Sequence, residues 1–188
     1  MGEDLDRLEE HLGSLPEPRT RPSFIVVSGL PGTGKSYFCR QLRERLPAVI
    51  VESDSLRKVL FPQPSYSAEE SLHLFQILHR LVGDLLRRGI PVIFDATNLE
   101  EKNREYLYSI AERQGARLIL VQIIAPTEVV KERLETRRSR SQSTSDADWE
   151  VYQKFRASVQ PLGRSHFVVD TSKDIRPSIA KILRETRH

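Results

Sequence analysis

Residues 29–36 are Gly29-Leu30-Pro31-Gly32-Thr33-Gly34-Lys35-Ser36, which match the Walker A pattern G-x-x-x-x-G-K-[ST] without a gap. An apolar run, Phe24–Val27, precedes this stretch, and a segment compatible with a helix, Ser36–Leu46, follows it. Glycines let the backbone curl so that successive N–H groups point at phosphate oxygens, and the positive N-terminal end of the next helix adds to that field. The sequence therefore predicts a phosphate-binding loop between a strand and a helix.

Each part of this loop has an expected partner on the nucleotide. Lys35 is expected to reach the β- and γ-phosphates of ATP, and the Ser36 hydroxyl to bind Mg²⁺. The residues predicted to bind the nucleotide lie in the loop and directly after it: Gly29, Gly32, Thr33, Gly34, Lys35, Ser36 and Tyr37. Cys39 follows in the next helix, where we interpret it as a small buried side chain rather than a nucleophile.

A nucleotide-binding loop is compatible with an ATPase, a GTPase, a kinase or a regulatory switch. The chain has no N-K-x-D element of the kind with which GTPases recognise guanine, and with 188 residues it is short for a mechanical ATPase. The leading hypothesis is therefore transfer of a phosphoryl group to a bound acceptor.

The apolar runs along the chain indicate the fold class. Four further runs rich in Val and Ile follow the first, at Ala48–Val51, Val92–Phe94, Leu118–Ile124 and His166–Val169. Continuous apolar runs of this length are typical of buried strands. Helical periodicity separates them, as in residues 68–88, where Leu72, Phe75, Leu78 and Val82 share one face before Gly89. This alternation predicts an α/β fold with a parallel sheet.

Asp54 and Arg57 follow the second predicted strand, where an open α/β sheet places its ligand crevice. If a helix starts here, the two side chains share a face. Asp54 could then accept the proton of an attacking hydroxyl, and Arg57 could hold an anionic group of the acceptor. The alternative is that Ser53 or Asp54 only caps the helix.

The third predicted strand ends in Asp95-Ala96-Thr97-Asn98. An apolar run that ends in an acid is typical of a Walker B element, so Asp95 is expected to hold the Mg²⁺ water shell together with Ser36. Thr97 or Asn98 could instead cap a helix that begins near Leu99, and for Asn98 capping and substrate contact are compatible.

A helix after Pro126 carries Arg133, Arg137 and Arg140, which fall on one face. Like charges at this spacing repel unless an anion lies between them. Together with the serine-rich residues 139–145 they predict an arginine-bearing lid, about residues 133–147, that closes over the ATP phosphates. The alternative is a solvated basic face.

Composition favours one domain and limits its partners. Lys and Arg number 29 against 26 Asp and Glu, a net charge of +3, which gives no bulk electrostatic case for a nucleic-acid coat protein. The single cysteine, Cys39, excludes an internal disulfide. No apolar run approaches the roughly 20 residues of a membrane span and no signal peptide is evident, so we expect a cytoplasmic protein without an obligate partner. We expect a leader or short helix at 1–22 and one kinase domain at 23–188.

These elements together resemble the polynucleotide 5′-kinase branch of the P-loop kinases, with its zeta-toxin and AAA_33-type ATP-binding relatives. The resemblance rests on the phosphate loop, Asp54 and Arg57 as D-x-x-R, Asp95–Asn98 as D-A-T-N, and Arg133 and Arg137 as R-x-x-x-R. It implies a five-stranded parallel sheet in the order 2-3-1-4-5. It also implies that Asp54 is the general base, that Arg57 contacts the acceptor or scissile phosphate, and that the lid arginines hold ATP.

The predicted catalytic residues are therefore Lys35, Asp54, Arg57 and Arg137. The expected acceptor is a polynucleotide 5′-hydroxyl. An open groove lined by Arg57, Lys58 and Arg104 would mean an oligonucleotide end, whereas a short dead-end pocket would mean a metabolite. A small hydroxylated metabolite, or an ATP-binding regulator with negligible turnover, is the alternative. The chain lacks the D-x-D-x-T phosphatase signature often joined to such kinases. Tyr37 and Tyr66 are its candidates for a stacking platform for a single strand, or else are packing residues.

Overall fold

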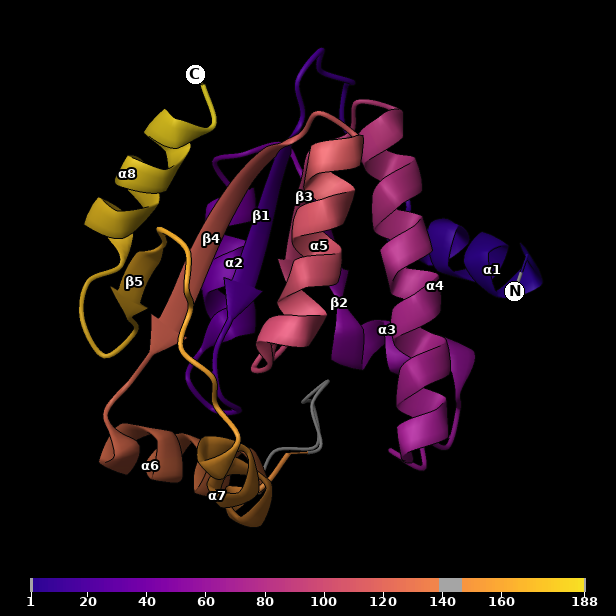
Figure 1. The fold of residues 1–188 in the computed structure, drawn as a ribbon. Coiled ribbons are helices and arrows are strands. Elements are labelled where there is room, and N and C mark those ends of the chain that lie inside the picture. The colour runs from indigo at the N-terminus through magenta and orange to yellow at the C-terminus, as the bar shows by residue number, and fades with distance from the viewer. Residues whose placement is uncertain (1, 139–146, 188) are drawn as a thin grey trace.

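The computed structural model describes residues 2–138 and 147–187. They form one parallel sheet of five strands in the order β2-β3-β1-β4-β5 (Figure 1). The strands are β1 (Ser23–Ser28), β2 (Val49–Glu52), β3 (Val92–Asp95), β4 (Arg117–Ile124) and β5 (Phe167–Asp170). Each predicted strand is present within a residue or two of its expected bounds, and the predicted α/β class and strand order are confirmed.

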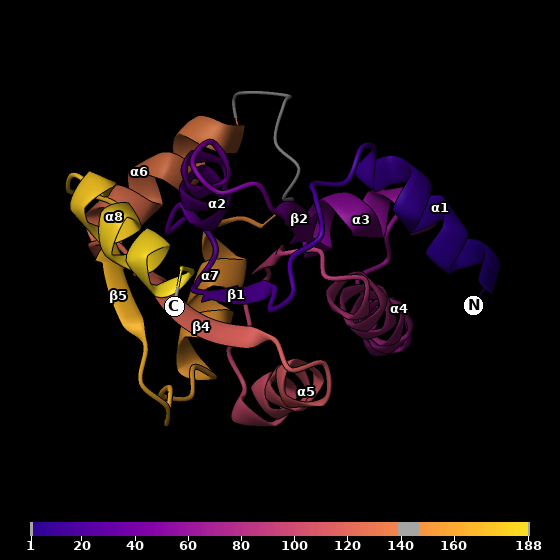
Figure 2. The same cartoon turned by 90° about the horizontal axis from the view of Figure 1, so that it is seen from above.

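Helices cover both faces of the sheet, as Figure 2 shows from above. One face carries α2 (Lys35–Arg43) and α8 (Arg176–Glu185), and the other carries α4 (Ala68–Arg87) and α5 (Glu101–Arg113). Beside β2 lie α1 (Gly2–Leu12) and α3 (Ser53–Leu60), whereas α6 (Thr127–Arg138) and α7 (Trp149–Ala157) lie beyond the carboxyl ends of the strands. Among the described helices, none combines the length and apolar character needed to cross a membrane.

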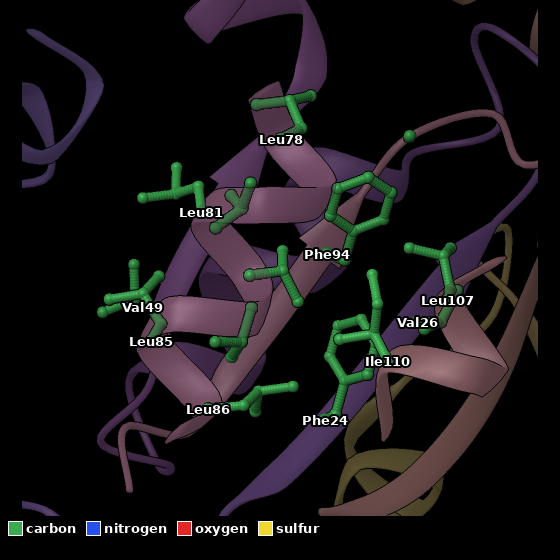
Figure 3. Close-up of a cluster of buried hydrophobic side chains, with 14 of the residues drawn as sticks. Phe24, Val26, Val49, Leu78, Leu81, Leu85, Leu86, Phe94, Leu107 and Ile110 are labelled. Atoms are coloured by element: carbon green, nitrogen blue, oxygen red, sulfur yellow. The ribbon is translucent and has the colours of Figure 1, made fainter. Parts of the chain in front are cut away.

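The larger core lies between the sheet and the helices α4 and α5 (Figure 3). Phe24 of β1 and Phe94 of β3 meet edge to face there, with ring centroids 6.5 Å apart. Leu78 and Leu81 of α4 pack onto this pair of strands, as the sequence periodicity predicts for Leu78. Leu72 was expected on the same face but is 62% exposed, whereas Leu74, two residues later, is fully buried. The buried face of α4 therefore runs through Leu74 and Leu78, and Leu72 lies on the other side of the helix.

The N-terminal segment contributes to this core. Helix α1 buries Leu5 and Leu8 and contacts both α3 and α4. The Arg7 Nη2 atom also donates a 2.6 Å hydrogen bond to the carbonyl oxygen of Val59, near the end of α3. Residues 2–12 are therefore a packed helix that supports α3.

Candidate active site

The carboxyl ends of the strands open into a cleft of about 1390 Å³. It is bounded by the loop of residues 29–36, the ends of β2 and β3, the helix α3, the first part of α4, and the helices α6 and α7. A typical pocket for one small ligand is about 300–1000 Å³, so the cleft has room for two ligands side by side.

The phosphate-binding loop is fixed to three neighbouring elements. The backbone N–H of Gly29 donates to the Thr97 carbonyl at 3.1 Å, which ties the loop to the end of β3. Gly32 has φ +77° and lies so close to α6 that a Cβ there would meet Leu134 at 2.9 Å. Gly34 has φ +93° and lies against the side chain of Thr171. These positions need glycine, because other residues strain at such φ values and a side chain would displace the neighbours.

Carboxylates gather below this loop, where Mg²⁺ would accompany a nucleotide. Ser36 donates its hydroxyl to Glu52 Oε1 at 3.0 Å. Asp95 is 3% exposed and its Oδ2 atom has no hydrogen-bond partner. Burial raises the pKa of Asp95 to about 6; Lys35 and Ser36 oppose this rise, whereas Glu52 and Asp54 add to it. The unsatisfied carboxylate oxygen beside a serine hydroxyl fits a divalent cation that keeps most of its ligands as water and phosphate oxygens.

Asp54 and Arg57 both face the cleft from α3, as the spacing predicts. The capping alternative is wrong, because the N-cap position belongs to Glu52 and α3 begins at Ser53. Arg57 is buried and paired: its Nη1 atom forms an ion pair with Glu70, and its Nη2 atom donates to Ser71 Oγ at 3.2 Å.

The predicted ATP-binding side chains occupy different positions in the cleft. Lys35 lines it and donates from Nζ to the Leu30 carbonyl at 3.2 Å, so its ammonium group lies over the loop. Tyr37 lines it with 49% of its surface exposed. Arg133 donates to the Thr171 hydroxyl at 2.8 Å and to the Thr171 carbonyl at 2.9 Å. Its guanidinium therefore lies between α6 and the end of β5.

The rest of the predicted lid is described only in part. Arg137 belongs to α6, but its side chain lies outside what the structure describes. Arg140 and the serine-rich residues fall within 139–146, which are outside the described residues. The shared arginine face therefore stays a prediction.

Two other expectations are corrected. Asn98 does not cap α5, which begins at Glu101 after Glu100 as N-cap; its buried amide instead donates to the Val27 carbonyl at 3.0 Å. Arg104 was named as a lining residue of an open groove that would mean an oligonucleotide acceptor, but it is 1% exposed. Its guanidinium donates to the carbonyls of Asn98 and Pro161 and pairs with Glu101, so it joins α5 to the segment after α7.

Three residues of the site were missed by sequence reasoning. Thr171 donates its hydroxyl to the Thr33 carbonyl at 2.5 Å and so supports the loop from the end of β5. Glu52 accepts from Ser36, and Glu70 pairs with Arg57. Thr171 and Glu52 lie at the carboxyl ends of parallel strands, where ligands bind, and that position could have singled them out. Glu70 is the third residue after the N-cap Ser67, the S-x-x-E spacing of a capping box, and that local pattern could have singled it out.

Comparison with known proteins places the chain in a family. Residues 24–162, well over half of the chain, match the model of the AAA_33 family, described as an AAA domain. The chain therefore belongs to this family of P-loop kinases.

Sequence identity to individual known proteins is low. The chain is 24% identical over 139 residues to 6-phosphofructo-2-kinase/fructose-2,6-bisphosphatase of Aquarana catesbeiana. The match covers 63% of this chain but only 29% of that protein.

Solved structures share the fold. Kti12 of Chaetomium thermophilum, in complex with ADP-AlF3, has a TM-score of 0.69 at 22% identity over 87% of this chain and 98% of that one. The APS kinase CysC of Mycobacterium tuberculosis, in complex with AMPPNP and APS, has a TM-score of 0.66 at 17% identity over 92% of this chain and 100% of that one.

Proposed function

We propose that this member of the AAA_33 family is a phosphotransferase that moves the γ-phosphoryl group of ATP to the hydroxyl group of a small acceptor. The observation that carries the proposal is the convergence of Lys35, Asp54 and Arg133 on one cleft with room for two ligands. Lys35 belongs to the phosphate loop, Asp54 comes from the neighbouring strand and helix, and Arg133 comes from α6. A nucleotide-binding module without an acceptor would not need the carboxylate of Asp54.

In this proposal the loop N–H groups and Lys35 hold the β- and γ-phosphates. Asp54 takes the proton of the acceptor hydroxyl, and the oxygen of that hydroxyl bonds to the γ-phosphorus. The bond between the γ-phosphorus and the β-phosphate oxygen breaks at the same time, so ADP leaves. Ser36 and Asp95 would hold Mg²⁺, which neutralises charge on the phosphates. Arg133, and Arg137 from the same helix, would balance the remaining negative charge. Phosphoryl transfer depends mainly on such positioning and electrostatics.

Two observations favour a small acceptor over a polynucleotide strand. Arg104, which would extend a positive groove for the strand, is buried in contacts with backbone carbonyls. The positive charge of Arg57 is balanced by Glu70. Two proteins that resemble this chain are named APS kinase and 6-phosphofructo-2-kinase, and these names also point to metabolites as acceptors. A polynucleotide 5′-hydroxyl is the second candidate, on the strength of the D-x-x-R and D-A-T-N elements.

A transfer assay with γ-labelled ATP and Mg²⁺ tests the proposal against a panel of hydroxylated metabolites and 5′-hydroxyl oligonucleotides. We expect Asp54→Asn to lower transfer by about 100-fold or more, because general-base catalysis contributes about 10²–10⁴-fold. ATP affinity should change less than about threefold, since the loop is untouched. Asp84→Asn, which removes an acid of α4 that pairs with Arg87 and does not line the cleft, is the matched control and should keep full activity.

Each remaining outcome decides between the hypotheses. Label on an oligonucleotide alone would move the acceptor to the second candidate. Full transfer by Asp54→Asn would remove Asp54 from its assigned role. Tight ATP binding by the unaltered protein with no labelled product would favour a regulator with negligible turnover.

A further inference from the structure

The segment between α3 and α4 contains an aromatic residue, Tyr66, whose backbone conformation is strained. Tyr66 has φ +54°, in the left-handed region that non-glycine residues seldom adopt. Glu70, one turn into α4, fixes the segment by accepting from the Ser65 backbone N–H at 2.6 Å, from the Ser65 hydroxyl at 2.7 Å and from the Tyr66 N–H at 3.3 Å. Strain that is held by its surroundings in this way is often found at ligand clamps.

The same carboxylate fixes the guanidinium that lies against Tyr66. Arg57 forms an ion pair with Glu70, and its Cζ atom is 5.0 Å from the centroid of the Tyr66 ring. Arg57 is 7% exposed, whereas Tyr66 is 46% exposed and lines the cleft. The buried cation thus supports a partly exposed aromatic ring in the lining of the cleft.

This cluster presents little net charge. Burial works against ionisation of Glu70, but hydrogen bonds from Ser65 and Arg57 outweigh it and lower the pKa of Glu70 to about 2. Glu70 therefore stays ionised near neutral pH and balances Arg57. A cluster with an aromatic ring and balanced charges suits a neutral planar group better than an anion.

The rest of the acceptor end agrees with an aromatic ligand. Phe75 of α4 and Phe155 of α7 line the same cleft as Tyr66. Asp54 lies one helical turn before Arg57 on α3, about 5 Å along the helix axis. A ligand that stacks on Tyr66 and offers a hydroxyl to Asp54 needs a planar ring joined to the hydroxyl by a short polar spacer. The base, ribose and 5′-hydroxyl of a nucleoside have this arrangement.

We propose that Tyr66, supported by Arg57 and held by Glu70, is a stacking platform for the base of the acceptor, and that the acceptor is a nucleoside moiety with a free hydroxyl. This inference rests on the proposed function, since it takes Asp54 as the group that meets the hydroxyl. The nucleoside moiety could be a free nucleoside or the 5′-terminal unit of an oligonucleotide.

Equilibrium binding to the full chain, in the presence of the ATP analogue AMPPNP, tests this directly. The probes are the four ribonucleosides, a dinucleotide with a free 5′-hydroxyl, and ribose as the ligand without a base. We expect the best base-bearing probe to bind at least about tenfold more tightly than ribose, because base–aromatic stacking is worth that much per ring. Tyr66→Ala should bring its affinity to the level of ribose, and Tyr66→Phe should stay within about threefold of the unaltered protein.

Tyr106→Ala is the matched control, because Tyr106 is 55% exposed on α5 and does not line the cleft. It should bind every probe as the unaltered protein does, and all variants should keep their affinity for AMPPNP. If the unaltered protein prefers the dinucleotide to all nucleosides, the moiety belongs to an oligonucleotide end; the reverse preference assigns it to a free nucleoside. Equal affinity for ribose and nucleosides, or full nucleoside affinity in Tyr66→Ala, overturns the inference.

Failure of the inference and failure of the proposed function give different results. If the unaltered protein phosphorylates a polyol without a base, and Tyr66→Ala does so equally well, the transfer function stands and the stacking platform does not. If nucleoside binding depends on Tyr66 but no acceptor is phosphorylated, the platform stands and the transferase does not.

Discussion

Asp95 lowers the stability of the ligand-free protein at neutral pH, and it lies where we propose that Mg²⁺ binds. Its carboxylate is buried beneath the phosphate-binding loop, with one oxygen lacking a hydrogen-bond partner. Burial raises its pKa from 3.8 to about 6, so the folded protein binds this proton more tightly than the unfolded chain does. The contribution of Asp95 to stability is therefore most favourable below about pH 4 and is lost as the pH rises through 6.

Asp95→Asn should remove this pH-dependent cost. A shift of about two pKa units corresponds to roughly 3 kcal/mol, so without nucleotide we expect the variant to be more stable than the unaltered protein at pH 8 by about 1–3 kcal/mol. At pH 4 the two proteins should differ little. Urea unfolding of both proteins at several pH values measures this difference, and a difference that does not grow between pH 4 and pH 8 would contradict the assignment.

Sequence reasoning succeeded at single residues where the backbone pattern decides their position. Asp54 and Asp95 follow parallel strands, so their place at the cleft follows from the strands alone. It failed for Arg104, because a charged side chain on a helix is usually exposed and its buried carbonyl partners come from the distant segment at Pro161. Thr171 directly follows β5, so its place at the cleft was predictable in the same way, but its contact with Thr33 joins residues far apart in the chain and has no local signal.

At the scale of elements, α1 supports α3, the helix to which we assign the acceptor end of the cleft. Leu8 of α1 is fully buried, and α1 contacts both α3 and α4. Arg7 donates a hydrogen bond to the carbonyl of Val59 in α3. Since α3 carries Asp54 and Arg57, the position of these side chains depends on how firmly α3 is held. The N-terminal helix therefore affects the α3 side of the cleft without lining it.

Leu8→Ala should destabilise the protein by about 2–5 kcal/mol, the usual cost of removing a fully buried leucine side chain. Leu72→Ala is the matched control, because Leu72 is 62% exposed on α4, and it should change the free energy of unfolding by less than about 0.5 kcal/mol. Chemical denaturation measures both variants. Equal effects of the two substitutions would mean that α1 is not packed as described.

The helices and strands were largely predictable because each has a local signal. Continuous Val and Ile runs mark the strands, and the end of α4 follows from Arg87 and Gly89. The start of α5 was not predictable: Asn98 is a good capping residue, but it takes a left-handed conformation, with φ +48°, and bonds to Val27 of another strand. A tertiary contact thus outweighed the local preference for a cap.

For the whole molecule, the phosphate-binding loop is a point where separate layers meet. It is bonded to the end of β3 through Gly29, packed against α6 at Gly32, and supported from the end of β5 by Thr171. The loop also follows β1, the central strand of the sheet, whose buried side chains pack on both faces, Phe24 and Val26 on one and Ile25 and Val27 on the other. A ligand that binds to this loop should therefore stabilise the entire chain rather than one part of it.

ATP analogue binding should accordingly raise the unfolding temperature of the whole molecule in one transition. At 100 times the dissociation constant the expected gain is about 2.7 kcal/mol, which corresponds to roughly 5–10 °C for a chain of this size. Asp54→Asn should show the same shift, because it alters the acceptor end only, whereas Lys35→Ala should show about 1 °C or less. Thermal unfolding with and without AMPPNP and Mg²⁺ measures all three proteins. An equal shift in Lys35→Ala would mean that the analogue binds elsewhere, and two separate transitions would mean that the loop does not couple the layers.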